Sequence, residues 1–268
     1  MSDPARLGVT KTKTTRRDAL KLAGGVALVV FAASSGVAGA QEATPVASPA
    51  PGHNLDGKHV VIRFRTVKPD HSPDELMTMI REGFVPLVKD IPGFIWYISG
   101  ADPETRGQFS IGVFADAAGV AESNRRAAEW GKQGAADLVE GDPTVYEGVI
   151  GIAAESSRAA ARGDLTGQYA VIRLRQPNPE WPVTEVMARI GEGYVPLIRE
   201  IPGFVLYFGS ADPASGDQAY VGVYGDKTEA DESTRIAGEW LTDNAYTFFS
   251  GDPQVAAGVI GVAAEGNE

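Results

Sequence analysis

Two pairs of arginines occupy alternate positions in apolar runs that have the composition of β-strands. The runs are VVIRFR and AVIRLR, and the pairs are Arg63 with Arg65 and Arg173 with Arg175. Side chains two residues apart share one face of a strand, and a guanidinium fork matches the geometry of an anionic oxygen pair. The arginines are therefore predicted either to hold the carboxylate, phenolate or enolate of a ligand or to form ion pairs within the protein.

Acidic residues suited to such ion pairs are Glu147, Asp116 and Asp226, which fall near the rim of the predicted sheet. If the arginines and their neighbours Val61 and Val171 face a common interior, four guanidiniums approach one another there. Buried cations of this kind need anionic partners.

A predicted helix at 117–139 carries a polar residue inside its apolar arc. This residue is Asn124, and Thr234 occupies the matching place in a second copy of the segment. A buried amide must find a hydrogen-bond partner, either a strand carbonyl or a substrate oxygen. Trp130 and Trp240 lie at the edge of the same arc, where each seals the helix against the sheet or lines a pocket.

The predicted site residues follow from these positions. Asn124 and Trp130 are the catalytic residues if the protein is an enzyme. The predicted ligand-binding residues are those of the arginine pairs, two tyrosines that we expect to face away from Phe94 and Trp96, and the second-copy helix positions: Arg63, Arg65, Tyr97, Arg173, Arg175, Tyr207, Thr234 and Trp240.

Other residue types argue against several kinds of chemistry. Glu82 and Glu192 recur in both copies, but the helical wheel places them opposite the apolar arc, where solvent surrounds them. The chain has no cysteine, and its three histidines are scattered, so we expect no thiolate chemistry, no metal site and no cofactor. Its formal net charge of -11 disfavours binding to nucleic acid.

The first forty residues have the pattern of an export signal. Arg16 and Arg17 precede a moderately apolar stretch, and Ala38-Gly39-Ala40 offers a small-x-small cleavage site. This resembles a twin-arginine (Tat) signal peptide at 1–40, which implies contact with the Tat translocase and a location outside the cell or at its envelope. The protein would then contact a membrane only if this signal peptide stayed uncleaved.

An internal repeat organises the rest of the chain. VPLVKDIPGFIWY at 85–97 matches VPLIREIPGFVLY at 195–207, and the offset of 110 residues is constant. The copies are predicted to form two domains, at 58–156 and 168–265. The Pro-, Ala- and Ser-rich segment at 41–57 is predicted to be a disordered linker.

Each copy has the pattern of an α+β unit. In the first copy, strands are expected at 60–65, 94–98, 108–114 and 145–153, and amphipathic helices at 73–90 and 117–139, the first of them kinked by Pro86. The order is β-α-β-β-α-β, the arrangement of a ferredoxin-like unit.

Such a unit covers only one face of its sheet with helices. The uncovered face is expected to carry Val61, Phe94, Trp96, Val113 and Val149, which cannot all be exposed to water. Two copies packed sheet to sheet solve this problem by forming an intramolecular dimeric α/β barrel. The chain is therefore expected to be a monomer that is built like a dimer.

The motifs resemble the antibiotic-biosynthesis-monooxygenase-like family of dimeric α/β barrels. The motifs that carry the resemblance are Pro-Gly-Phe-x-x-Tyr at 92–97, Gly-Val-Phe-x-Asp at 112–116 and Glu-Ser-x-Arg…Glu-Trp at 122–130. The resemblance implies a pocket between sheet and helices in each unit. It also implies relatives that include cofactor-free oxygenases of aromatic polyketides and haem-degrading enzymes.

The haem-degrading branch of that family places an axial histidine on or just after the second helix. The histidines of this chain are His53, His59 and His71, and none occupies that position. The sequence therefore favours an exported protein of undetermined activity that binds a small apolar or aromatic ligand. The alternatives are a cofactor-independent monooxygenase acting on an aromatic substrate and a non-catalytic structural module.

The twin-arginine interpretation predicts that replacing Arg16 and Arg17 together by lysine abolishes export in the native host. Cell fractionation with an antibody against the chain measures this. Continued export of the double variant would contradict the interpretation.

Overall fold

The computed structural model describes residues 54–156, 164–244 and 246–266. The predicted signal at 1–40 and most of the predicted linker at 41–57 lie outside these residues. The elements of the first half are β1 (His59–Val67), α1 (Pro73–Met79), the π-helical turn η1 (Ile80–Phe84), α2 (Val85–Lys89), β2 (Phe94–Ala101), β3 (Gly107–Phe114), α3 (Ala117–Trp130), the π-helical turn η2 (Gly131–Ala135), α4 (Ala136–Leu138) and β4 (Val139–Glu155).

The second half repeats this order with fewer breaks in its last helix. Its elements are β5 (Tyr169–Pro177), α5 (Val183–Arg189), the π-helical turn η5 (Ile190–Tyr194), α6 (Val195–Arg199), β6 (Phe204–Ala211), β7 (Gln218–Tyr224), α7 (Lys227–Asp243) and β8 (Phe249–Glu265). No helix among the described residues is long and apolar enough to cross a membrane.

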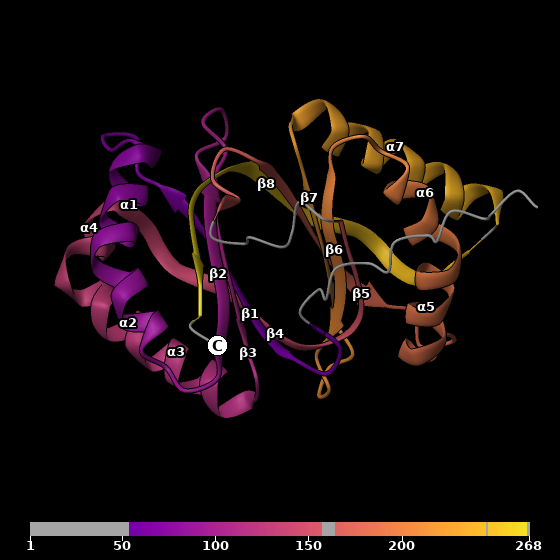
Figure 1. The fold of residues 1–268 in the computed structure, drawn as a ribbon, viewed down its shortest axis with the longest axis horizontal. Helices are drawn as coiled ribbons and strands as arrows, with labels where there is room; N and C mark the ends of the chain where they lie inside the picture. Colours follow the sequence, from indigo (N-terminus) through magenta and orange to yellow (C-terminus); the bar gives the residue numbers. More distant parts are fainter. Residues whose placement is uncertain (1–53, 157–163, 245, 267–268) are drawn as a thin grey trace, which may run out of the picture. The chain divides into compact units, whose positions relative to one another are not determined.

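All strands join in one closed antiparallel barrel. Its order is β1-β3-β2-β8-β5-β7-β6-β4, so the two halves meet along the pairs β2–β8 and β4–β6. The helices of each half lie outside the barrel, on opposite sides of it (Figure 1). The predicted closure of an α+β barrel is confirmed.

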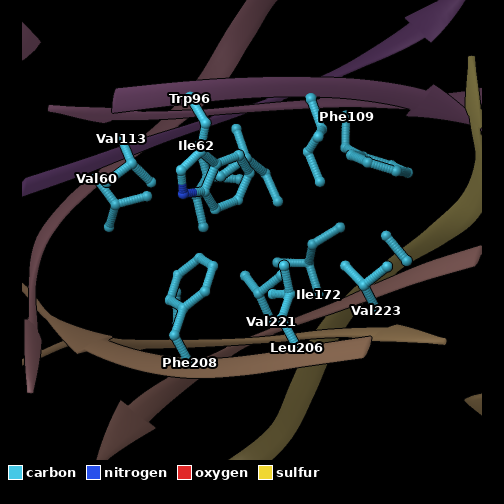
Figure 2. Close-up of a cluster of buried hydrophobic side chains, with 14 of the residues drawn as sticks. Val60, Ile62, Trp96, Phe109, Val113, Ile172, Leu206, Phe208, Val221 and Val223 are labelled. Atoms are coloured by element: carbon cyan, nitrogen blue, oxygen red, sulfur yellow. The ribbon is translucent and has the colours of Figure 1, made fainter. Parts of the chain in front are cut away.

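The barrel interior is filled by apolar side chains from both halves (Figure 2). Trp96 of the first half meets Phe208 of the second edge to face, with ring centroids 6.1 Å apart. This interior therefore belongs to neither half alone, and its dense packing leaves the sheet–helix layers as the place for a site.

Of the five residues predicted to face the interior, three do not: Val61, Phe94 and Val149. Val61 and Phe94 pack against the helices, while Ile62 and Trp96 fill the barrel. Both faces of β1 are buried, so its apolar run has no alternation that reveals which side faces the interior. In β2, the register shifts between Phe94 and Trp96, which places Phe94 on the helix side.

At the other end of the predicted face, Val113 lies inside the barrel as expected. In β4, the interior residues are Tyr146 and Ile150 and not Val149. This strand also changes register against β6, between Ile150 and Ile152.

Each long helix is interrupted. Ahead of Pro86, the Val85 N–H bonds the Ile80 carbonyl in η1, so the proline falls in the first turn of α2, where a missing N–H costs little. After α3, Gly134 has φ 122°, which a glycine adopts without strain, and the chain turns there toward β4.

Residues 54–57, predicted to be linker, belong to the barrel. Leu55 is 1% exposed and packs in the interior together with Leu165, which holds the matching place in the second half. The Gly57 N–H donates to the Ile150 carbonyl at 2.8 Å. The folded unit therefore begins before residue 58.

Leu55→Ala is expected to lower the free energy of unfolding by about 2–4 kcal/mol, because it leaves a cavity in the barrel interior. Leu87→Ala, at a site 37% exposed, is the control and should cost less than about 1 kcal/mol. Urea unfolding of the two variants measures the difference. Equal small losses would show that Leu55 does not anchor the fold.

Candidate functional site

The site in the first half begins at Arg63. This residue lies on β1, faces the helices and is 4% exposed. Its Nη2 donates to Ser123 Oγ at 3.1 Å and to Asn124 Oδ1 at 2.7 Å. The Asn124 amide in turn donates to Glu147 Oε1 at 2.5 Å. Asn124 therefore links the buried guanidinium on β1 to a carboxylate on β4.

Helix α3 is held so that Ser123 and Asn124 face the sheet. Its N-terminus is capped by Asp116, which accepts from the Gly119 N–H at 2.9 Å. Asp116, which was predicted to pair with an arginine, is therefore a helix cap. Asp226 caps α7 in the same way by accepting from the Glu229 N–H.

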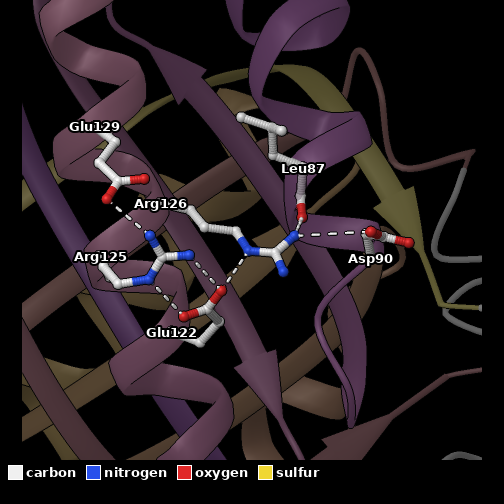
Figure 3. Close-up of polar contacts among 6 residues, drawn as sticks. All are labelled: Leu87, Asp90, Glu122, Arg125, Arg126 and Glu129. Carbon is white, nitrogen blue, oxygen red and sulfur yellow. Dashed lines mark hydrogen bonds and ion pairs between the residues drawn. The ribbon is translucent and has the colours of Figure 1, made fainter.

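The opposite face of α3 carries a surface ion-pair cluster (Figure 3). Glu122 accepts from Arg125 and Arg126, and these hydrogen bonds lower the pKa of Glu122 to about 2. Arg126 also donates to the Leu87 carbonyl at 2.8 Å and so joins α3 to α2. The acidic and basic residues of this helix thus pair on its outer face, away from Arg63.

Arg63 and Arg65 carry charge that no carboxylate neutralises directly. Neither guanidinium forms an ion pair within the described parts of the chain. Burial lowers the pKa of Arg63 to about 10, and nearby Arg65 also acts to lower it. Both remain cationic at neutral pH. The predicted salt bridges to Glu147, Asp116 or Asp226 are therefore wrong, although Glu147 is reached through Asn124.

The prediction that four arginines share one interior is also wrong. Arg63 and Arg65 line cavities of the first half, whereas Arg173 and Arg175 line a cavity of the second half. Both pairs point from the barrel toward the helices, because β1 and β5 bury Ile62 and Ile172 inside.

A groove of about 480 Å³ opens beside the first arginine pair. Its walls come from α3, η2, α4, β1 and β4, and include Arg63, Arg65, Asn124, Lys132, Asp142 and Glu147 among alanines, glycines and Val145. An inner recess of about 30 Å³ shares Arg63, Arg65 and Ala127 with the groove. The two cationic side chains thus stand where recess and groove meet.

Aromatic rings enclose the inner recess. Trp130 packs on Phe84 with ring centroids 5.4 Å apart, and Tyr97 approaches Phe84 at 5.6 Å. A Cβ atom at Gly83 would lie 2.6 Å from Trp130 Nε1, so the glycine permits this close approach. Burial raises the pKa of Tyr97, which keeps its hydroxyl neutral.

The second half keeps the arginines but changes their surroundings. Arg173 donates to Thr234 Oγ1 at 2.5 Å, and Arg175 lies 4.9 Å from the ring centroid of Phe249. Its recess of about 40 Å³ is lined by Tyr194, Tyr207 and Trp240 among others. All the predicted site residues of both halves thus lie in or beside these cavities.

Sequence reasoning missed the groove itself. Gly131 and Lys132 line it, and the sequence suggests Glu147 only as an ion-pair partner. The available signal was the difference between halves, because the matching positions hold Leu241, Thr242 and Ala257.

Residues set aside from the sequence remain outside the site. Glu82 and Glu192 are exposed, as predicted. His71 contacts Glu75 in a surface loop, and neither it nor His59 lines the groove or the recesses. Within the described chain, no group of three or more potential metal ligands gathers.

No family model and no curated protein sequence matches the chain. A protein from Fusobacterium nucleatum subsp. nucleatum, named as a candidate monooxygenase, matches with TM-score 0.58 and 14% identity over 78% of this chain and 95% of its own. A protein named as a candidate chlorite dismutase matches with TM-score 0.55 and 10% identity over 77% and 95%. A haem-binding protein from Thermus thermophilus matches with TM-score 0.50 and 13% identity over 80% and 94%.

This chain has the fold of a monooxygenase-like α/β barrel. At such low identity the likeness concerns the fold alone.

Asn124→Leu is expected to lower the free energy of unfolding by about 1–3 kcal/mol, because buried Arg63 loses its 2.7 Å acceptor. Asn124→Thr should recover part of this loss, since Thr234 accepts from Arg173 in the second half. Urea unfolding distinguishes the variants. Full stability of Asn124→Leu would mean that the amide does not support Arg63.

Proposed function

We propose that the first half binds a small molecule with an anionic group and an aromatic or apolar body. The observation that carries this proposal is that Arg63 and Arg65 stand at the junction of groove and recess without a direct ion pair among the described residues, with Glu147 and Asp142 acting on them only from a distance. A buried cation without an anionic partner is costly, and a bound anion removes that cost. Carboxylates, phenolates and enolates present oxygens that match two guanidinium forks.

The cavities suggest how such a ligand lies. The anionic group contacts Arg63 and Arg65, and the body fills the groove against Ala127, Gly131 and Val145. A substituent no larger than a few atoms enters the recess beside Phe84, Tyr97 and Trp130. The groove volume of about 480 Å³ is in the usual range for small-molecule sites.

Asn124 has a positioning role in this arrangement. Its carbonyl holds Arg63 and its amide holds Glu147, at opposite ends of the side chain. Its removal should therefore disturb the direction of the Arg63 guanidinium before it removes any contact with the ligand.

The proposal includes the architecture and location inferred from the sequence. Each half is a ferredoxin-like repeat, which is supported by the strand order β4-β1-β3-β2 in the first half and β8-β5-β7-β6 in the second. The chain is a monomer that is exported through the twin-arginine route. It binds its ligand at the cell envelope or outside the cell.

A cofactor-independent monooxygenase is the second candidate. It is supported by the name of the Fusobacterium protein and by Trp130 and Asn124 standing beside an arginine pair suited to stabilise an enolate or phenolate. Neither described histidine lines the groove or either recess, so histidine ligation of a haem is not part of the proposal.

Native mass spectrometry of the chain purified from its own host should show an additional mass that is lost on denaturation. Gly131→Leu should abolish this mass, because it introduces the larger side chain that the second half has at the matching position, Leu241, and so narrows the groove. No atom lies within 4 Å of a Cβ built at Gly131, so the variant should fold normally. Ala121→Leu, on the exposed side of α3, is the matched control and should retain the mass.

The anionic character of the ligand is tested with 2-naphthoate and its uncharged isostere 2-naphthamide. The carboxylate should bind at least about tenfold more tightly than the amide, and Arg65→Gln should remove that preference. Equal binding of both probes would contradict the proposed role of the arginines. Oxygen uptake with the natural ligand would select the oxygenase.

A further inference from the structure

The second half contains a recess whose size and walls differ from those of the groove. It is lined by β5, η5, β6, β7, α7 and β8 and has a volume of about 40 Å³. Tyr220 stands where the first half has Ser110, and Leu241 stands where it has Gly131. The recess is far smaller than the first-half groove of about 480 Å³, so it is suited to a much smaller molecule.

Two guanidiniums that form no direct ion pair among the described residues border this recess. Arg173 is 7% exposed, and its hydrogen-bond partner is the neutral Thr234. Arg175 packs on the Phe249 ring. Within the described chain neither arginine forms an ion pair, and burial together with the charge of Arg173 lowers the pKa of Arg175.

A neutral hydroxyl donor faces the same space. The Tyr194 hydroxyl bonds Ser233, and the Tyr220 hydroxyl bonds Gln218. Tyr207 is 3% exposed and lines the recess, yet its hydroxyl has no hydrogen-bond partner among the described residues. Burial raises the pKa of Tyr207 well above its ordinary value, so the hydroxyl keeps its proton and can donate it in a hydrogen bond.

We infer that this recess is a separate binding site for a small planar monoanion, of the size of formate, acetate or an inorganic oxyanion. The two guanidiniums neutralise the anion, and the Tyr207 hydroxyl donates to one of its oxygens. The volume of about 40 Å³ leaves room for roughly three or four non-hydrogen atoms, which excludes an aromatic ring. The stacked rings of Tyr207 and Tyr220 form a wall against which a planar anion can lie.

This site does not depend on the function proposed for the first half. The groove is lined by Arg63 and Arg65, and the recess by Arg173 and Arg175. The same chain would thus hold a larger ligand in one half and a small anion in the other.

Isothermal titration of the full chain with sodium acetate tests the inference, with ionic strength held constant by the sodium salt of an anion too bulky to enter the recess. One acetate should bind per chain, in the second-half recess, with a dissociation constant on the order of 1 mM. Acetamide has the same shape without the charge and should not bind measurably. Benzoate should not compete for this site.

Matched variants locate the anion. Tyr207→Phe keeps the ring and should weaken acetate binding about tenfold, because it removes a hydrogen bond to a charged acceptor. Arg175→Gln should abolish binding at this site, and Arg125→Gln, on the outer face of α3, should leave it unchanged. Circular dichroism confirms that each variant is folded.

Three results would overturn the inference. They are equal heats for acetate and acetamide, loss of acetate binding in Arg65→Gln with retention in Arg175→Gln, and unchanged affinity in folded Tyr207→Phe. Because 2-naphthoate reports on the groove and acetate on the recess, failure of one site leaves the other measurable.

Discussion

The pairing of strands between the two halves is the constraint on which the rest of the structure depends. Strands β2 and β4 would be open edges of the first half, and they are completed by β8 and β6 of the second. Closing the barrel in this way commits one face of every strand to a shared apolar interior. Polar side chains of β1 and β5 must then lie on the outer face, under the helices, and this is where both arginine pairs are found.

The duplicated arrangement allows the two halves to differ without loss of the fold. Arg63 and Arg173 both reach a polar residue on the following helix, Asn124 or Thr234, so the buried cation is supported in each case. The two halves differ in the size of the cavity beside this arginine. Small residues such as Gly131 leave a groove in the first half, whereas the second half fills the corresponding layer with larger aromatic and aliphatic side chains.

Much of this architecture could be predicted from the repeat and the apolar patterns, including the closed barrel, whereas the shared interior expected for the four arginines could not be upheld. The faces of β1 could not be predicted, because VVIRFR is buried on both sides and no alternation distinguishes Val61 from Ile62. The register shift after Phe94 and the π-helical turn that carries Gly131 are likewise set by tertiary packing. The groove depends on that turn, and so the sequence pointed to Arg63, Arg65 and Asn124 but not to Gly131, Lys132 or the shape of the groove.

The most direct test of the central claim is to follow the arginine Nε–H resonances by NMR while an aromatic carboxylate is added, with assignments from single Arg→Lys variants. The account predicts saturable shifts of the Arg63 and Arg65 signals with a common dissociation constant, while Arg125 and Arg126 on the outer face of α3 stay unchanged. Shifts confined to these outer arginines, or no saturable shift of the strand pair, would contradict the claim that strand arginines without a direct ion pair form the binding site.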